Sequence, residues 1–192
     1  MVLKMYITML QTILGGAFNV LFCKFYKGEK YPIDRGLCYK DGNRILGDNK
    51  TYVGMISMVV ITAIIQLIIG LILWATDTEQ YCELYNNYPN LIPYNLLVGA
   101  LFGITYMLFE LPNSFLKRRY DIESGGTTKA SGRKKYAFFL LDQFDSIIGV
   151  ILVLKLLSGI TWGQYLLYVL LGGFTHVAVN LILMALHIRR TL

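Results

Sequence analysis

Charged residues are scarce in this chain. Asp, Glu, Lys and Arg make up 16% of its 192 residues, while hydrophobic residues make up 55%. A soluble domain carries about 25% charged residues. The deficit argues against an ordinary soluble domain and predicts that lipid replaces water around much of the surface.

Cysteine is also rare. The three cysteines are too few and too scattered for a disulfide framework or a structural zinc site. The first apolar run has no small-residue cleavage site after it, so we do not expect it to be a signal peptide. A net charge of +6 fits a nucleic acid, an anionic lipid or a phosphorylated substrate. The positions of the basic residues decide among these.

Five apolar stretches are long enough to cross about 30 Å of hydrocarbon, which takes about 20 helical residues. We therefore predict an all-α integral membrane protein with five transmembrane helices, forming a single domain over residues 1–192. The last two helices are joined by so few residues that they form a tight hairpin. The predicted spans are residues 2–22, 53–74, 91–110, 138–157 and 163–187.

Two of the four connections contain no basic residue. These are residues 75–90 and 158–162, whereas loops 23–52 and 111–137 carry seven basic residues each. By the positive-inside rule, the two long loops and the C-terminus are cytosolic and the N-terminus is outside. We expect a multi-pass protein of the cell membrane, with its polar chemistry facing the cytosol and no nucleic-acid partner.

Two carboxylates lie inside the fourth predicted span. Asp142 and Asp145 share one helix face at spacing i, i+3, and ionisable groups inside a bilayer mark candidate functional sites. Asn19 and Glu110 fall in the same cytosolic slab, although the role of Glu110 stays open. The aspartates suit Mg²⁺, which is usually held by one or two carboxylates plus substrate phosphates. The alternative is that each Asp pairs with a neighbouring Lys or Arg.

A basic segment follows the third predicted span. Pro112 is expected to break the helix at the membrane surface. Asn113 and Ser114 then stand beside three cations, and such a set makes a phosphate cradle. Ordinary flanking charges would explain the cations alone but not the amide and the hydroxyl. The cations are Lys117, Arg118 and Arg119.

A third polar block opens the second predicted span. Lys50 and Thr51 at a helix N-terminus can meet an anion through backbone N–H groups and the helix dipole. Asp48 and Asn49 precede them and are further substrate-binding candidates. The block is not a P-loop, because it lacks the spaced glycine before Gly-Lys-Thr.

These blocks resemble the CDP-archaeol synthase family, membrane cytidylyltransferases related to phosphatidate cytidylyltransferase. The resemblance covers nearly the whole chain, and the blocks agree in their order and spacing against the membrane segments. It implies a five-helix fold, transfer of CMP from CTP to a lipid phosphate with release of pyrophosphate, and a requirement for Mg²⁺. The matching blocks are Pro32-Ile33-Asp34, Arg44 to Thr51, Ser114 to Arg119 and Leu141 to Ser146.

The resemblance carries roles to Lys50 and Thr51, Ser114, Lys117 and Arg118, and Asp142 and Asp145. We assign catalysis to Lys50, Lys117 and Arg118, and metal binding to Asp142 and Asp145. The partners are then CTP and a lipid phosphate, and a homodimer is compatible with the sequence. The substrate-binding candidates are Asn19, Asp48, Asn49, Thr51, Asn113, Ser114 and Arg119.

Three alternatives stay open. The first is a phosphatidate cytidylyltransferase making CDP-diacylglycerol; the bacterial enzymes are longer and carry a His-Gly-Gly block where Lys134-Lys135-Tyr136-Ala137 stands here. The second is a small transporter, with the intramembrane carboxylates and Gln66 lining an ion path. The third is a non-catalytic lipid-binding scaffold. A pathway between the two faces would favour transport, whereas a cavity closed outward but open to lipid would favour the enzyme.

Overall fold

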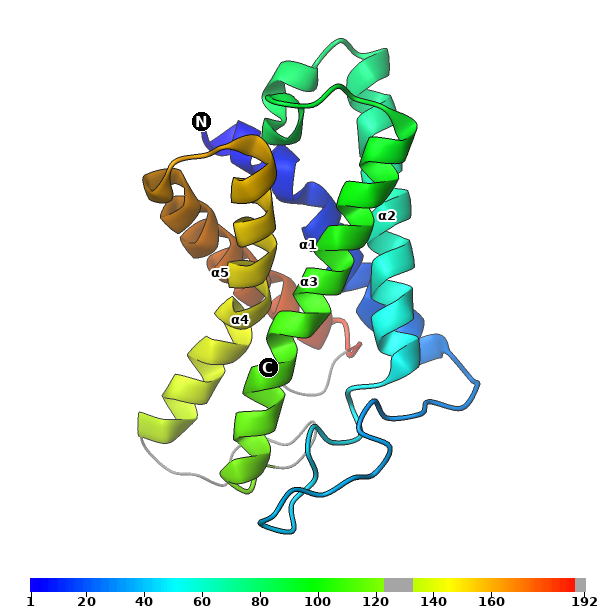
Figure 1. Cartoon of the computed structure of the whole chain (residues 1–192), viewed down its shortest axis with the longest axis vertical. Coiled ribbons are helices and arrows are strands. Elements are labelled where there is room, and N and C mark those ends of the chain that lie inside the picture. Colours follow the sequence, from blue (N-terminus) through cyan, green and yellow to red (C-terminus); the bar gives the residue numbers. More distant parts are fainter. Residues whose placement is uncertain (123–132, 189–192) are drawn as a thin grey trace.

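The part of the protein that the structure describes is built from five long α-helices, as a computed structural model shows (Figure 1). The structure describes residues 1–122 and 133–188, with the backbone alone at 133–137 and 139. The described residues form no β-strand, so the all-α prediction is confirmed. The helices are α1 (Val2–Phe25), α2 (Tyr52–Ala75), α3 (Ile92–Arg119), α4 (Arg133–Ser158) and α5 (Trp162–Ala185), with short 3₁₀ helices η1 (Glu79–Tyr81) and η2 (Glu83–Tyr85) between α2 and α3.

The outer surface of the helices is apolar. In the described part of the chain, α1, α2, α3 and α5 are each long and apolar enough to cross a membrane. Ile56, Ile64 and Ile72 of α2 are about half exposed, which suits lipid but would be costly in water. The prediction of a polytopic membrane protein is confirmed at this level.

Glycines bring α2 and α3 into close contact. A Cβ atom on Gly99 would lie 2.6 Å from the Cα atom of Ala63, and one on Gly103 would lie 2.7 Å from the Cα atom of Val59. Membrane helices gain little from hydrophobic burial against lipid, so close packing through small residues holds them together. The two helices form a rigid wall, and α4 packs along α3 beside it (Figure 1).

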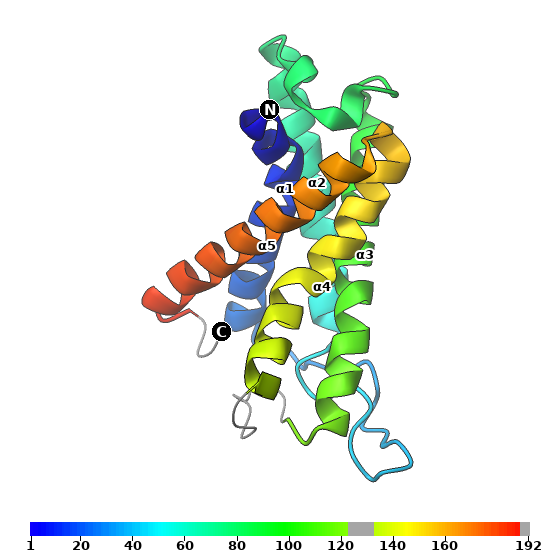
Figure 2. The same cartoon turned by 90° about the vertical axis from the view of Figure 1, so that its left-hand side faces the viewer.

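The α4–α5 connection is the predicted tight hairpin. Gly159 takes the positive φ of +71° that the turn requires. Thr161 then caps α5 by accepting from the backbone N–H of Gln164, whose side chain accepts from Thr161 in return. From this turn α5 slants across the bundle, and its C-terminal end lies away from α3 and α4 (Figure 2).

The predicted end of the third helix was wrong. We expected Pro112 to stop it after Glu110, but α3 continues through Pro112 to Arg119. A proline inside a helix removes one hydrogen bond and crowds the preceding turn, at a cost of about 3 kcal/mol. Asn113 and Lys117 bond to carboxylates of α4, and these contacts offset that cost. Residues 123–132 of the predicted loop 111–137, and the last four residues of the chain, lie outside the described residues.

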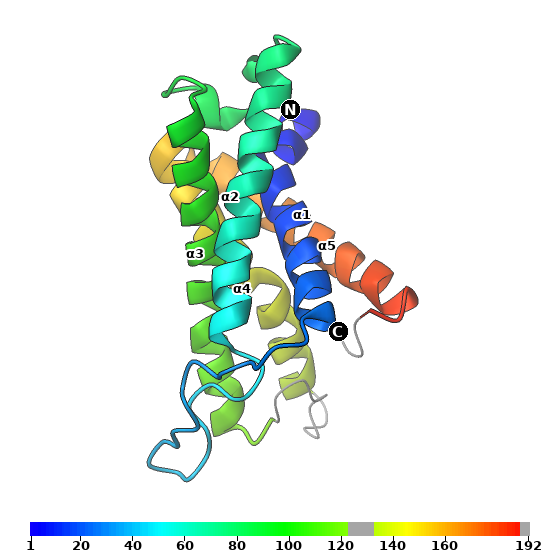
Figure 3. The same cartoon turned by 90° about the vertical axis from the view of Figure 1, so that its right-hand side faces the viewer.

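The two ends of the bundle differ. At one end the segment between α2 and α3 folds back over the helices and buries its own Cys82 and Leu84 against them. It is fastened to α1 by a 3.1 Å ion pair between Lys4 and Glu83, and by a 3.0 Å bond from the Glu83 N–H to the Thr8 hydroxyl. We call residues 76–91 the cap. The opposite end carries the α1–α2 connection, residues 26–51, beside the last turns of α3 (Figure 3).

Candidate active site

A cavity of about 440 Å³ lies among α1, α3, α4, α5 and the end of the α1–α2 connection. No residue of the cap lines it. One part of its wall is charged and the other is mainly apolar. The predicted site residues on its wall are Asn19, Asn49, Lys50, Asn113, Ser114, Lys117, Arg118, Asp142 and Asp145.

The paired aspartates are joined by an amide from α3. The side-chain NH₂ of Asn113 donates to Asp142 at 2.6 Å and to Asp145 at 2.9 Å. Lys117, one turn further along α3, forms an ion pair with Asp142. The alternative that each aspartate pairs with a neighbouring Lys or Arg therefore holds for Asp142. Asp145 is bonded instead to Asn113 and to the Ser146 N–H. The side-chain oxygen of Asn113 (Oδ1) is buried and has no hydrogen-bond partner in the described residues.

A second ion pair spans the mouth of the cavity. Lys50 directly precedes Thr51, the N-cap residue of α2, and pairs with Glu110 of α3. Both side chains are about 20% exposed, so they remain accessible to a ligand entering the cavity. The role of Glu110 was open from sequence, and the structure places it on the cavity wall within electrostatic reach of Asp145.

The wall on α1 is polar at the same level. The Asn19 side chain lies 2.6 Å from the Ser57 hydroxyl of α2 and 3.8 Å from the Cys23 thiol. On the α3 side, Arg118 donates to the carbonyl of Ile122 and leaves its Nε unpartnered among the described residues. Basic side chains thus reach the cavity from α3 and from the α1–α2 connection.

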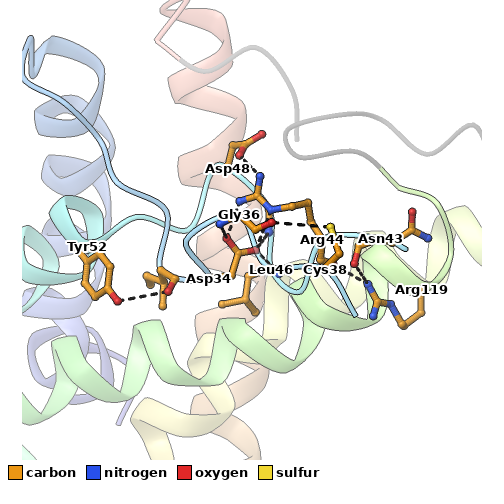
Figure 4. A network of polar contacts seen from close by, with 11 residues as sticks. Asp34, Gly36, Cys38, Asn43, Arg44, Leu46, Asp48, Tyr52 and Arg119 are labelled. Carbon is orange, nitrogen blue, oxygen red and sulfur yellow. Dashed lines mark hydrogen bonds and ion pairs between the residues drawn. The ribbon is translucent and has the colours of Figure 1, made fainter. Parts of the chain in front are cut away.

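Three predicted site residues do not line the cavity. Thr51 is the N-cap of α2, accepting from the Gly54 N–H at 3.1 Å. Asp48 is exposed and pairs with Arg44 at 2.7 Å. Arg119 stacks over the Tyr39 and Phe115 rings and donates to backbone carbonyls of the α1–α2 connection (Figure 4). Their direct contact with a substrate stays a prediction.

Comparisons with known proteins identify the family of this chain. The family described as CarS-like, CDP-archaeol synthase, matches residues 1–191. The chain belongs to the CDP-archaeol synthase family. A CDP-archaeol synthase of Methanospirillum hungatei is 32% identical, covering 81% of this chain and 85% of its own. One of Saccharolobus solfataricus is 29% identical, over 82% of this chain and 79% of its own.

A solved structure shares the fold. It is described as an intramembrane enzyme for archaeal membrane lipids biosynthesis and covers 92% of each chain with a TM-score of 0.59. At 21% identity, this likeness supports the architecture alone.

Within this family member, the donor set fits Mg²⁺. In the described part of the chain, no three His, Cys, Asp or Glu side chains converge to hold an ion by themselves. Mg²⁺ does not need such a cage, because water and substrate phosphates complete its shell. Asp142 and Asp145 supply two carboxylates that the Asn113 amide holds together.

Sequence reasoning missed part of the machinery. Glu110 lacked a partner until the fold brought Lys50 to it. The deeper wall contains Thr12 of α1 and His176 of α5, which no motif marked. Asp34 was visible only as part of a matching block.

Proposed function

We propose that this protein transfers CMP from CTP to a membrane lipid phosphate, releasing pyrophosphate and forming a CDP-activated lipid. The observation that carries the proposal is the single cavity that joins a charged end, with Lys50, Lys117 and Asp142, to an apolar end among membrane helices. The relatives named CDP-archaeol synthase favour an archaeal ether lipid as the acceptor.

The apolar end of the cavity suits the lipid chains. Ile13, Ala17 and Val20 of α1 face Val179 and Leu183 of α5 across it. Because the C-terminal end of α5 lies away from α3 and α4 (Figure 2), we propose that the acceptor enters laterally between α4 and α5. Its phosphate then reaches the charged end without leaving the bilayer.

The reaction needs charge neutralisation more than proton transfer. A non-bridging oxygen of the lipid phosphate attacks the α-phosphorus of CTP, the bond from that phosphorus to the bridging oxygen breaks, and pyrophosphate leaves. The attacking oxygen is already anionic at neutral pH, so no strong general base is required. Lys50, Lys117 and Arg118 would bind the phosphates and stabilise the charge that moves to the leaving group.

Asp142 and Asp145 would hold Mg²⁺, with Asn113 keeping the two carboxylates together. The ion would neutralise phosphate charge when bound. In this structure Lys117 and Lys50 are engaged with Asp142 and Glu110. These pairs leave the site with no large excess of either charge, and the lysines must exchange carboxylate oxygens for phosphate oxygens when the nucleotide binds.

We also propose that α4 completes a set of five membrane spans, with the cap outside and the cavity mouth in the cytosol. The α1–α2 connection and the end of α3, which lie at the cavity mouth, carry Lys50, Lys117 and Arg118, whereas the cap contains no basic residue. The N-terminus is then outside and the C-terminus cytosolic, in the cell membrane.

The transporter alternative is disfavoured by the outer half of the bundle. Gln66, its candidate polar residue there, donates to Asn95 at 3.0 Å and to Tyr85 at 3.1 Å. The cap covers this end and adds no residue to the cavity wall. A cavity that does not extend to the cap supports an enzyme.

The test is pyrophosphate release by the purified protein with CTP, Mg²⁺ and a panel of lipid phosphates. The panel contains unsaturated and saturated ether lipids, phosphatidic acid and a polyprenyl phosphate. Turnover with an ether lipid, lost without Mg²⁺ or with ATP in place of CTP, is the expected result. Preference for phosphatidic acid would favour the ester-lipid enzyme, and no turnover in folded protein would overturn the proposal.

A further inference from the structure

The α1–α2 connection has almost no regular secondary structure. Over residues 26–51 it contains only two isolated bridges, Pro32 to Thr51 and Cys38 to Arg44. Yet it carries Lys50 next to its C-terminal end, and this residue must stand at a defined place on the cavity wall. A segment with so few backbone ladders needs another source of order.

Asp34 is that source. Its side chain is completely buried in the connection. One oxygen accepts from the Gly36 N–H at 3.2 Å and from Arg44 Nη2 at 2.5 Å, and the other from the N–H groups of Leu46 and Gly47, both at 2.9 Å (Figure 4). Burial alone would raise the pKa of this carboxyl, but the bonds from Arg44 and the three backbone amides outweigh it and hold the pKa well below its usual range.

The bonds around Asp34 continue to Lys50 and return. The Gly47 carbonyl accepts from the Lys50 N–H at 3.4 Å, and the Lys50 carbonyl accepts from the Ile33 N–H at 2.8 Å. Ile33 is covalently joined to Asp34, so the four residues form a closed ring. The backbone of Lys50 is held on both sides, and its side chain extends to Glu110 in the cavity.

The same connection is fastened to the helix that carries the other cations. Arg119 of α3 donates to the carbonyl of Arg44 at 2.6 Å and to that of Asn43 at 3.1 Å. Arg44 is the residue that Asp34 holds from the other side. Asp34 is thus connected to Lys50 by one route and to the last turn of α3, with Lys117 and Arg118, by another.

We propose that Asp34 is a positioning residue for the nucleotide, which holds Lys50 in register with Lys117 and Arg118 before CTP arrives. Asp34 does not line the cavity, so it acts through the backbone of Lys50 and through Arg44. Preorganised cations bind phosphates without the entropic cost of ordering a loop. This inference rests on the proposed function, because it takes CTP as the ligand of these cations.

The test compares Asp34→Asn with Glu29→Gln in the full-length protein. Asp34→Asn keeps the shape but removes the charge and turns an NH₂ group towards the amide N–H groups. We expect the KM for CTP to rise at least tenfold, while the KM for the lipid phosphate changes less than twofold. Glu29 lies exposed in the same connection, accepts from the Tyr31 hydroxyl and takes no part in the bonds around Asp34, so its variant should change either KM less than twofold.

A double-mutant cycle tests the route of action. In a Lys50→Ala background, Asp34→Asn should weaken equilibrium binding of CTP less than threefold, because the group it positions is gone. Independent, multiplying losses would overturn the proposed route. Unchanged CTP affinity in Asp34→Asn would overturn the inference itself while leaving the proposed function intact.

Hydrogen exchange reads the connection without any substrate. The amides of Gly36, Leu46 and Gly47 should be protected in the wild type and lose protection in Asp34→Asn, while the amides of α2 and α3 stay protected. Should that variant fail to fold, Arg44→Lys replaces it, with an expected loss of CTP affinity of about fivefold, and an unchanged affinity would overturn the inference. A wild type that shows the protection but binds no CTP would instead overturn the proposed function.

Discussion

Lys117 of α3 and Asp142 of α4 form an ion pair on the cavity wall, and Asn113, one turn before Lys117, ties Asp142 to Asp145. The last turns of α3 are therefore as much a part of the site as the aspartates. Together with the pair between Lys50 and Glu110, this pair nearly balances the positive and negative side chains that line the cavity. Ligand binding must exchange these partners, and that requirement decides how variants behave.

Neutralising either aspartate should remove catalysis but not the fold. Asp142→Asn or Asp145→Asn should lower turnover about 100-fold or more, because each removes one of the two carboxylates that would hold Mg²⁺ at the phosphates, while the helices stay inserted. Glu79→Gln is the matched control, since Glu79 is a carboxylate of the cap, bonded to Asn90 at 2.6 Å and far from the cavity wall, and it should retain activity. Near-normal turnover in both Asp variants would refute the metal assignment.

Removing the Glu110 charge should strengthen nucleotide binding. In the absence of Mg²⁺, Glu110→Gln frees Lys50 and removes an anion that repels the triphosphate. A unit charge about 8 Å away in a medium of effective dielectric constant about 20 amounts to roughly 2 kcal/mol, so CTP should bind at least tenfold more tightly. Calorimetry in EDTA measures this, with Glu29→Gln on the exposed connection as the control. Weaker binding by Glu110→Gln would show that the carboxylate itself assists the nucleotide.

The sequence predicted the helices and the charged residues of the site, but not how the charged residues pair. Apolar length alone located the membrane helices, because no water is available there to satisfy an open backbone. The end of α3 could not be predicted, because Pro112 is a local signal for a break and the compensating bonds from Asn113 and Lys117 come from another helix. The role of Asp34 was equally hidden. Four of its five hydrogen bonds come from residues ten or more positions away, and three of the five are donated by backbone groups that carry no sequence signature.

The order of the α1–α2 connection should not depend on pH in the physiological range. The folded pKa of Asp34 lies below its unfolded value of about 3.9. Its contribution to stability is therefore fully present above the unfolded pKa and is lost only as the pH falls through the lower folded pKa. Amide protection factors at Leu46 and Gly47, corrected for intrinsic exchange, should be equal at pH 5 and pH 7. A decrease between these values would contradict the assigned ionisation.

Two glycine substitutions should change stability in opposite directions. Gly103→Ala places a Cβ atom against the α2 backbone, which cannot move away, and should destabilise the protein by about 1–3 kcal/mol. Gly16→Ala meets only the Tyr106 hydroxyl, at 3.7 Å, and should stabilise α1 by about 0.5–1 kcal/mol through its helix propensity. Thermal unfolding in detergent compares the two. Equal melting temperatures would mean that α2 and α3 pack less closely than the structure shows.

The three natural cysteines provide a test of orientation without engineered labels. Cys38 is exposed on the α1–α2 connection, whereas Cys82 is a buried residue of the cap. Burial is the main cause that raises the pKa of Cys82 to about 11, so at pH 7 very little of this thiol is the reactive thiolate. Cys23 lies on the cavity wall.

If the connection is cytosolic, a membrane-impermeant maleimide should label Cys38 in inside-out vesicles and not in right-side-out vesicles. Cys82 should stay unlabelled from both sides, and CTP should slow labelling of Cys23 because the nucleotide fills the cavity. Cys38→Ala is the control that assigns the signal. Labelling of Cys38 from the outside would reverse the orientation and remove the cavity from cytosolic CTP, so this single experiment bears on the topology and on the reaction together.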